Sequence, residues 1–444
     1  MVARGFTQEE GVDFTETYAP VMKFETFRIL IALALNLGLN ISSYDVVAAY
    51  LYSEIDQEVY MTQPENYQVG DSVLRLKKGL YGLRQSAKLW NDDLKKKLLE
   101  FGCIQSINDP GLYIYVMNNS FCWILVYVDD IIVFSNSATL RGNLEQHLKR
   151  YYDITHSEKL TSLLGIRVEI RSDNVLLYQR HYIEQISQKF GQTNSKRATT
   201  PIDTGIMLTP SGKSEQSYPY RSIIGSLMFP ARMFRPDISY AVGYLARFSD
   251  KYSSVHWNQA KKVVRYLEST KNCSMVYRKS SLKITCYVDA SFGGDGIDCR
   301  STTGYLIYLG DNLVIWKSSK QKTTALSTAE AEIVAARECL KDAIWLRESM
   351  KELGMGEQSI TIKEDNQACI KLCEKQMINT KVKHIAIAIS FIREQVENGI
   401  VNFEYCSTND MIADCLTKAL GPNKVKEFRG LMNIHDGGVL DDHE

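Results

Sequence analysis

The sequence lacks a net charge, a metal-binding cysteine pair and a long apolar run. Its 52 Lys and Arg balance 52 Asp and Glu, so any grip on nucleic acid must come from local patches. The ten cysteines include no Cys-x-x-Cys pair, and the polar start Met1–Glu10 is no secretory leader, which predicts a reduced intracellular compartment. The apolar runs 29–39 and 121–134 are too short or too charged to span a bilayer, which takes about 20 apolar residues. A secreted or membrane-spanning chain is therefore not expected.

The length and composition are those of a multidomain globular protein. With 444 residues, 45% of them hydrophobic and 23% charged, the chain is expected to form two to four domains. Four groups of cations could serve nucleic acid or could be ordinary solvated faces. They are Lys77-Lys78 with Arg84 and Lys88, Lys95 to Lys97, Lys261-Lys262 with Arg265, and Lys317, Lys320 and Lys322.

Two adjacent carboxylates, Asp129 and Asp130, interrupt the apolar stretch from Phe121 to Phe134. The β-branched and aromatic flanks predict two strands, with the pair at or near the tip of a hairpin. Burial of bare charge in such a stretch is costly, and a bound metal ion would offset that cost. The alternative is that both residues are ordinary turn formers.

The first 150 residues contain further predictable elements. Apolar spacing predicts helices from Glu25 to Leu39 and from Ser86 to Phe101. A strand from Ile41 is expected to run into a turn or short helix, with Asp45 at the junction. The loop Leu76–Gln85 has two glycines and three basic residues, which suits close approach of a ligand backbone.

The rest of the chain is predicted to contain a linker, a helical region and a strand-rich region, in that order. Residues 198–218 are rich in Thr, Ser, Pro and Gly and predict a linker. A helical region from Arg221 to Leu267 follows, with a break at Arg235-Pro236. Beyond Lys283 the pattern predicts the order βββαβαβα, apart from extra helices. The expected strands are 284–289, 304–309, 313–317, 360–364 and 401–405, and the long helix is 328–353.

Four acids in this last part have settings suited to one site. Asp289 ends the first strand, Glu332 lies on the long helix, Asp365 follows the fourth strand and Asp414 opens the last helix. Such carboxylates could share two divalent ions about 4 Å apart, which activate water and stabilise the leaving oxygen in phosphodiester hydrolysis. The alternative is four unrelated surface acids.

Two glutamates at the start of the long helix, Glu330 and Glu332, are expected to have different roles. The run Ser327–Glu330 matches a capping box, which makes Glu330 the expected capping partner. Glu332 is then left at the edge of the apolar stripe that includes Ile333 and Ala336. We therefore expect the Glu332 carboxylate to point toward the sheet.

Short motifs, each occurring once, are distributed along nearly the whole chain in a characteristic order and spacing. They are residues 5–8 (GFTQ), 16–21 (ETYAPV), 45–51 (DVVAAYL), 60–64 (YMTQP), 80–86 (LYGLRQS), 127–130 (YVDD), 235–240 (RPDISY), 301–304 (STTG), 327–332 (STAEAE), 364–367 (EDNQ) and 413–418 (ADCLTK). Together they resemble the reverse transcriptase and ribonuclease H part of a Copia/Ty1-type (Pseudoviridae) retrotransposon Pol polyprotein. Their joint order makes a chance resemblance negligible.

The resemblance implies an RNA-directed DNA polymerase with ribonuclease H activity. Its fold would be an α+β polymerase palm, in a multidomain right-hand polymerase, followed by a ribonuclease H-like α/β domain. The implied polymerase ligands of two Mg²⁺ ions, with Mn²⁺ as an alternative, are Asp45, Asp129 and Asp130. The implied ribonuclease H ligands, again of two ions, are Asp289, Glu332, Asp365 and Asp414.

The resemblance also implies substrate contacts and partners. Tyr50 matches the position that stacks under the deoxyribose and excludes a 2′-hydroxyl, with a plain core tyrosine as the alternative. Arg84 and Gln85 match the loop that touches template or nucleotide. The implied partners are an RNA template, a DNA primer, RNA–DNA hybrid and deoxynucleoside triphosphates, in a cytoplasmic particle or the nucleus. No oligomeric state is indicated.

By the same resemblance, five segments are expected. These are partial fingers and palm (1–150), the end of the palm and thumb region (151–200), linker and helical connection (201–280), ribonuclease H-like domain (281–423) and a C-terminal tail (424–444). The family's polymerase region normally begins before the residue 5 motif, so part of the fingers is expected to be missing. Residues 281–423 hold all four ribonuclease H acids and are expected to fold alone. The alternative is a catalytically impaired remnant or a host-adopted nucleic-acid-binding protein, retaining at most ribonuclease H activity.

Overall fold

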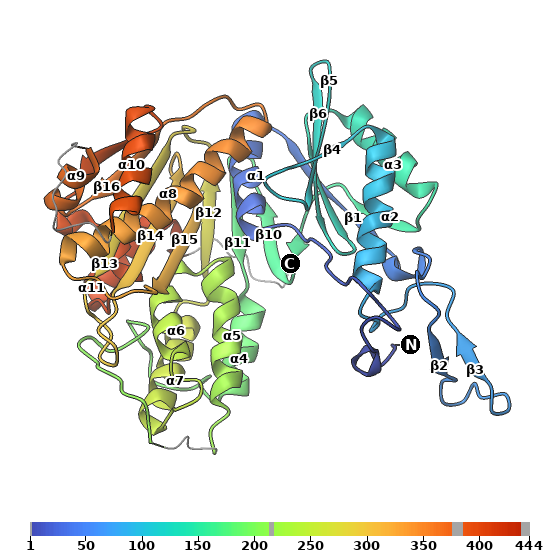
Figure 1. Cartoon of the computed structure of the whole chain (residues 1–444), viewed down its shortest axis with the longest axis horizontal. Helices are drawn as coiled ribbons and strands as arrows, with labels where there is room; N and C mark the ends of the chain where they lie inside the picture. Colours follow the sequence, from blue (N-terminus) through green and yellow to red (C-terminus); the bar gives the residue numbers. More distant parts are fainter. Residues whose placement is uncertain (1, 213–216, 375–384, 437–444) are drawn as a thin grey trace. The chain divides into compact units, whose positions relative to one another are not determined.

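The computed structural model describes residues 2–212, 217–374 and 385–436. The chain divides into two compact units, Met1–Leu163 and Leu164–Glu444, and Figure 1 follows the chain through both. Helices and strands alternate through each unit, which confirms the expected mixed α/β class. Within the described ranges, no helix is both long and apolar enough to cross a membrane.

The first unit is built on an antiparallel sheet with the strand order β4-β5-β6-β7-β1-β8. These strands are β1 (Asn40–Val46), β4 (Ile104–Gln105), β5 (Leu112–Met117), β6 (Ser120–Tyr127), β7 (Asp130–Ser135) and β8 (Ile154–Ser157). Its helices are α1 (Phe24–Leu37), α2 (Ser86–Phe101) and α3 (Ala138–Lys149), and a separate hairpin is formed by β2 (Tyr60–Thr62) and β3 (Val73–Arg75). The short β9 (Ser162–Leu163) ends the unit.

Apolar periodicity explains how α2 and the sheet form one core. On α2 the buried Trp90, Leu94 and Leu98 recur every four residues and therefore lie on one face. This face packs in a cluster with alternate strand residues such as Ile124 of β6 and Val133 of β7. The helix ends at Gly102, whose φ of 102° is readily adopted by glycine. The predicted bounds of α2 are confirmed.

The second unit begins with a sheet and four helices. Its strands β10 (Ile166–Ile170), β11 (Asn174–Tyr178), β12 (Cys273–Arg278) and β18 (Ile434–Asp436) follow the order β18-β12-β11-β10. The helices are α4 (Arg180–Lys189), α5 (Tyr220–Met233), α6 (Ser239–Ala246) and α7 (Ser254–Ser269). The described part of the predicted linker 198–218 has no helix or strand, and residues 213–216 lie outside the described ranges. The expected break at Arg235-Pro236 separates α5 from α6.

A second sheet in this unit has the order β15-β14-β13-β16-β17. Strands β13 (Ile284–Ser291), β14 (Thr302–Leu309) and β15 (Asn312–Lys320) pair antiparallel, whereas β16 (Ile360–Glu364) and β17 (Val401–Tyr405) run parallel to β13. The long helix α8 (Thr328–Glu352) packs on β13 and β14, and α9 (Gln367–Glu374), α10 (Ala386–Glu397) and α11 (Pro422–Leu431) complete the set (Figure 1). This confirms the predicted order βββαβαβα.

The segment expected to end at residue 423 has contacts beyond both of its ends. That boundary falls inside α11, and β18 beyond it pairs with β12. On the second sheet, Trp316 Nε1 of β15 donates a hydrogen bond to the Ala231 carbonyl of α5, at 2.8 Å. The Tyr308 hydroxyl of β14 donates to the Leu431 carbonyl of α11, at 3.0 Å. The second sheet is therefore tied to segments on both sides of 281–423.

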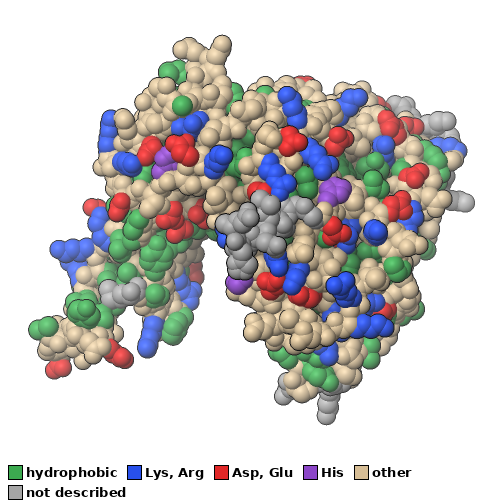
Figure 2. Space-filling model, turned by 180° about the vertical axis from the view of Figure 1, so that it is seen from behind, with side chains coloured by type: hydrophobic (Ala, Val, Ile, Leu, Met, Phe, Trp, Pro, Cys, Tyr) green, Lys and Arg blue, Asp and Glu red, His purple; other side chains and the backbone are tan. Residues whose placement is uncertain are grey.

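The charged side chains are mixed on the surface, and most cysteines are buried. On the face shown in Figure 2, side chains of Lys and Arg are interspersed with those of Asp and Glu. Nine of the ten cysteines are buried and only Cys299 is exposed. All ten are free thiols.

Candidate active sites

The hairpin of β6 and β7 carries the first group of acids at its tip. Tyr127 pairs with Asp130, so Val128 and Asp129 form a two-residue turn, as the sequence predicts. Val128 has a φ of 55°, which is unusual for a β-branched residue. The Trp90 indole donates a hydrogen bond from Nε1 to the Val128 carbonyl, at 2.7 Å. A buried side chain of α2 therefore holds this backbone.

Strand pairing brings a third carboxylate to the tip. Asp45 lies opposite Asp130 in the register of β1 and β7, and the Val46 amide donates to the Asp129 carbonyl at 3.2 Å. Burial, followed by the charge of Asp129, raises the pKa of Asp45. Burial, followed by the charges of Asp129 and Asp45, raises the pKa of Asp130 to about 6. The three carboxylates thus repel one another, and a shared cation would relieve that repulsion.

Two tyrosines border this acidic tip. Tyr50 lies in a short 3-10 helix, Ala49–Leu51, and its ring centroid is 4.5 Å from that of Tyr81. Burial and then the charge of Asp129 raise the pKa of both hydroxyls, so both lie within electrostatic reach of that carboxylate. Tyr81 is not among the residues that the sequence predicts for this site. Its signal was an aromatic side chain in the glycine-flanked loop that precedes α2.

The other two predicted substrate contacts, Arg84 and Gln85, are engaged by the N-terminal segment. Arg84 Nε donates to the Gly5 carbonyl at 2.9 Å. Gln85 is fully buried; its amide donates to the Asp13 carbonyl at 2.8 Å and accepts from Gln8 Nε2 at 3.0 Å. In this arrangement Gln85 exposes no atom to a substrate, because its polar groups hold residues 8–13 against the loop. Its expected contact with template or nucleotide stays a prediction.

A second group of acids lies at the sheet of the second unit. Carboxylate oxygens of Asp289, Glu332 and Asp365 all come within 4.8 Å of one another, from β13, α8 and the end of β16. Asp289 and Glu332 are buried and Asp365 is partly exposed. Glu332 Oε2 is buried without a hydrogen-bond partner among the described residues. Because a buried carboxylate oxygen needs a partner, these residues fit a divalent cation.

The fourth predicted acid, Asp414, differs from expectation in two ways. It lies in a short 3-10 helix, Ile412–Leu416, rather than opening α11, and it is not part of the three-residue group. Its carboxylate forms an ion pair with Lys418, at 2.8 Å from Oδ1 to Nζ. The neighbouring Thr417 hydroxyl donates to Asp289. Burial and then the Asp289 charge raise the pKa of Asp414, so it still faces the acidic group.

At the start of α8, Ser327 and Glu330 make the capping hydrogen bonds, and Glu332 takes no part in the cap. The Ser327 hydroxyl accepts a hydrogen bond from the Glu330 amide at 3.2 Å, as the capping box predicts. The Glu330 carboxylate, however, accepts from the Leu326 amide at 2.7 Å, one residue before the expected partner. Glu330 is thus occupied at the helix end, and Glu332, two residues on, is left to join Asp289.

Sequence reasoning missed Glu364. This residue is fully buried; its Oε1 accepts from the Asn366 amide at 3.0 Å, while Oε2 has no hydrogen-bond partner among the described residues. Burial raises the pKa of Glu332, and the charge of Glu364 is the next largest cause. The available signal was alternation on β16, because Glu364 shares a face with the buried Ile360 and Ile362.

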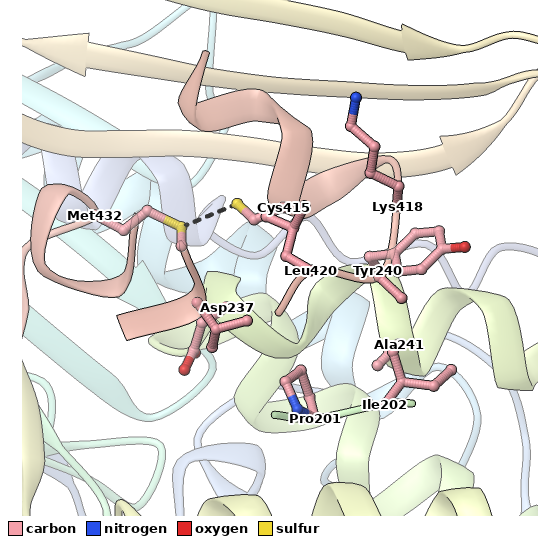
Figure 3. A pocket seen from close by; sticks show the side chains of 11 residues that line it. Pro201, Ile202, Asp237, Tyr240, Ala241, Cys415, Lys418, Leu420 and Met432 are labelled. Carbon is pink, nitrogen blue, oxygen red and sulfur yellow. Dashed lines mark hydrogen bonds between the residues drawn. The ribbon is translucent and has the colours of Figure 1, made fainter. Parts of the chain in front are cut away.

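A small cavity near Asp414 is not a substrate site. Figure 3 shows it between α6, the linker residues Pro201 and Ile202, and the segment that carries Cys415 and Lys418. Its volume is about 20 Å³, which leaves room for about one water molecule. The Lys418 ammonium group points away from Pro201 and Ile202 (Figure 3). The cavity therefore has no room for a substrate.

The sequence is similar to curated proteins and to a known family. A family model described as reverse transcriptase (RNA-dependent DNA polymerase) matches residues 1–204. The retrovirus-related Pol polyprotein from transposon TNT 1-94 of Nicotiana tabacum is 32% identical, over 98% of this chain and 34% of that protein. The corresponding polyprotein from transposon RE1 of Arabidopsis thaliana is 34% identical, over 98% of this chain and 30% of that protein. The chain spans about a third of the length of these relatives.

A shorter relative and one solved structure extend the comparison. A putative transposon Ty5-1 protein of Saccharomyces cerevisiae is 33% identical, over 67% of this chain and 99% of that protein. Among solved structures, a foamy viral protease-reverse transcriptase dRH in complex with double-stranded DNA matches with a TM-score of 0.50. It is 14% identical, and the match covers 85% of this chain and 59% of that one. At this identity the match describes the fold.

Proposed function

Because the chain belongs to the reverse transcriptase family of Ty1/Copia-type retrotransposon Pol polyproteins, we propose that it performs two reactions. The first unit extends a DNA primer along an RNA template with deoxynucleoside triphosphates. The second unit cuts the RNA strand of an RNA–DNA hybrid. Each reaction uses its own group of carboxylates.

The convergence of Asp289, Glu332 and Asp365 carries the ribonuclease half of the proposal. Three carboxylates from three elements, with one buried oxygen left unpartnered, are the arrangement that holds divalent cations at a phosphodiester. Mg²⁺ bound there would supply a hydroxide-like water and would stabilise the leaving oxygen. The chain's own residues position the site. Thr417 orients Asp289, and Lys418 holds Asp414 beside it.

The register of β1 against β7 supports the polymerase half. It sets Asp45 opposite Asp130, and both lie beside Asp129 at a tip whose backbone Trp90 holds. These three residues would hold the cations that draw the triphosphate and the primer 3′-hydroxyl together. Tyr50, bordering the same carboxylates, would meet the sugar of the incoming nucleotide and exclude a 2′-hydroxyl.

Two single substitutions test the two halves against each other. Purified chain is assayed for primer extension on an RNA template and for cleavage of a labelled RNA–DNA hybrid. Asp129→Asn should lower extension by a thousandfold or more, because a two-metal clamp contributes several kcal/mol. It should leave hybrid cleavage intact. Glu332→Gln should do the reverse, since each change keeps side-chain shape and removes one charge.

Glu330→Gln is the matched control for Glu332→Gln, because it lies two residues away on the same helix and Gln can still accept from the Leu326 amide. It should cut hybrid at the wild-type rate. Equal loss at both glutamates, or cleavage that survives Glu332→Gln, would overturn the ribonuclease assignment. Wild-type chain inactive in both assays with Mg²⁺ and with Mn²⁺ would favour a non-catalytic remnant instead.

A further inference from the structure

Two hollows in the second unit adjoin along α7 and the segment that follows α4. One, of about 670 Å³, is lined by residues of 192–197 and 265–272, and the other, of about 450 Å³, by residues 195–199 and by part of α7. Ser195, Arg197 and Arg265 line both, so the two hollows adjoin, and we refer to the pair as the groove. This groove includes part of the Lys261–Arg265 patch, for which the sequence left open a nucleic-acid role or a solvated face.

The lining of the groove is mainly cationic and polar. Six basic side chains line it against the three acids Asp203, Glu268 and Asp436. Hydroxyl groups from Thr193, Ser195 and Ser269 are also present. The six basic residues are Arg180, Lys196, Arg197, Lys262, Arg265 and Lys271.

The excess charge is concentrated at one end of the 192–197 segment. Lys262 is paired with Asp203, and Lys271 with Glu268 at 2.9 Å. Lys196 and Arg197 are exposed, and neither forms an ion pair with another described residue. Arg265 donates to Gln192 Oε1 at 3.1 Å, which uses no opposing charge. Lys196 and Arg197 can therefore bind an anion, and Arg265 lies in the same groove.

We propose that this groove binds the sugar-phosphate backbone of the RNA–DNA hybrid, at a place separate from the carboxylates that cut it. The proposal rests on the ribonuclease function proposed above, and it names a contact surface for that substrate. Arginine and lysine heads would meet successive phosphates, and the hydroxyl groups of the lining would donate to phosphate oxygens. Because such contacts release counterions, affinity through the groove must fall as salt rises.

The test measures binding of the full chain to a fluorescent hybrid duplex between 50 and 300 mM salt. EDTA is present so that no strand is cut. The double variant Lys196→Ala, Arg197→Ala should bind about tenfold more weakly or worse at 0.1 M salt. Its plot of log affinity against log salt should be less steep by roughly 0.9 for each lost phosphate contact. Single-stranded RNA of the same sequence forms a second arm.

A matched control removes the same charge elsewhere on this unit. Lys251 and Lys279 are exposed, line neither hollow and form no ion pair with another described residue, so Lys251→Ala, Lys279→Ala should keep the wild-type slope and affinity. Equal behaviour of the two double variants would overturn the groove while leaving the ribonuclease proposal standing. A loss as large for single-stranded RNA would overturn the duplex assignment. Wild-type chain that binds no hybrid at all would instead count against the proposed function.

Discussion

At the scale of single residues, Val128 occupies a backbone conformation that costs about 1–3 kcal/mol for a side chain of its kind. The residue directly precedes the two carboxylates of the hairpin tip. Trp90 is 1% exposed and makes one hydrogen bond to its carbonyl. We infer that this bond keeps the tip in its strained form, which makes Trp90 a positioning residue for Asp129.

Trp90→Phe should therefore slow primer extension without weakening nucleotide binding. The change keeps an aromatic ring in the core and removes the donor, so kcat should fall roughly 5- to 30-fold, equivalent to about 1–2 kcal/mol. KM for the nucleotide should change little. Trp123→Phe is the control, because Trp123 is equally buried and pairs with Phe134, four residues along β6 from the tip pair Tyr127–Asp130. A similar fall in kcat for both variants would make the role of Trp90 merely structural.

The metal-free stability of the chain should depend on Glu332 and on pH. Burial and neighbouring acids raise the pKa of Glu332 far above its usual value. A raised pKa means that the folded chain holds the proton more tightly than the unfolded chain, so folded stability falls as pH rises above the unfolded pKa, near 4.5. In EDTA, Glu332→Gln should therefore melt above wild type at pH 8, and this difference should shrink toward pH 5.

Each kcal/mol gained should appear as about 2–4 °C in the melting temperature. Glu330→Gln should give no such gain, because its carboxylate already accepts a hydrogen bond at the helix cap. Added Mg²⁺ or Mn²⁺ should stabilise wild type and fail to stabilise Glu332→Gln. A melting difference independent of pH would refute the view that the buried charge is the destabilising factor.

At the scale of elements, local pattern predicts most of the fold. Helix α2 and strands β16 and β17 have the bounds that apolar spacing indicates, and the Asp pair lies at a hairpin tip. These elements are predictable because their periodicity and end residues are local properties. Asp289, Glu332 and Asp365 were expected in one group together with Asp414, because two follow or end strands and Glu332 lies at the edge of the apolar stripe of its helix; the structure groups the first three.

Features set by distant partners were not predictable from local pattern. Gln85 is buried because the segment 8–13 folds back onto it, 72 or more residues away in sequence. The Arg235–Asp237 pair, read only as part of a motif, is a fully buried bidentate ion pair joined by the Tyr266 hydroxyl of α7. A buried pair of this kind needs every partner in place. Its role is to join α7 to the turn between α5 and α6, which no short window of sequence reveals.

At the scale of the whole molecule, the second unit should fold as one cooperative body that is larger than the segment 281–423. A fragment 164–444 should melt cooperatively by circular dichroism. A fragment 281–423 should melt at a distinctly lower temperature or not fold, because it loses most of α11, β18 and the Ala231 partner of Trp316. Near-equal melting temperatures for the two fragments would show that the contacts beyond residue 423 and before residue 281 contribute little.

The distribution of thiols also gives the molecule internal reporters. Cys103 and Cys122 are buried in the first unit, whereas the other seven buried cysteines belong to the second. A thiol-reactive dye will label the exposed Cys299 at once, but it can reach a buried thiol only while the surrounding structure is open. The rate at which the buried cysteines of each unit are labelled in the native chain therefore reports the opening of that unit separately from the other. No engineered probe is needed to read it.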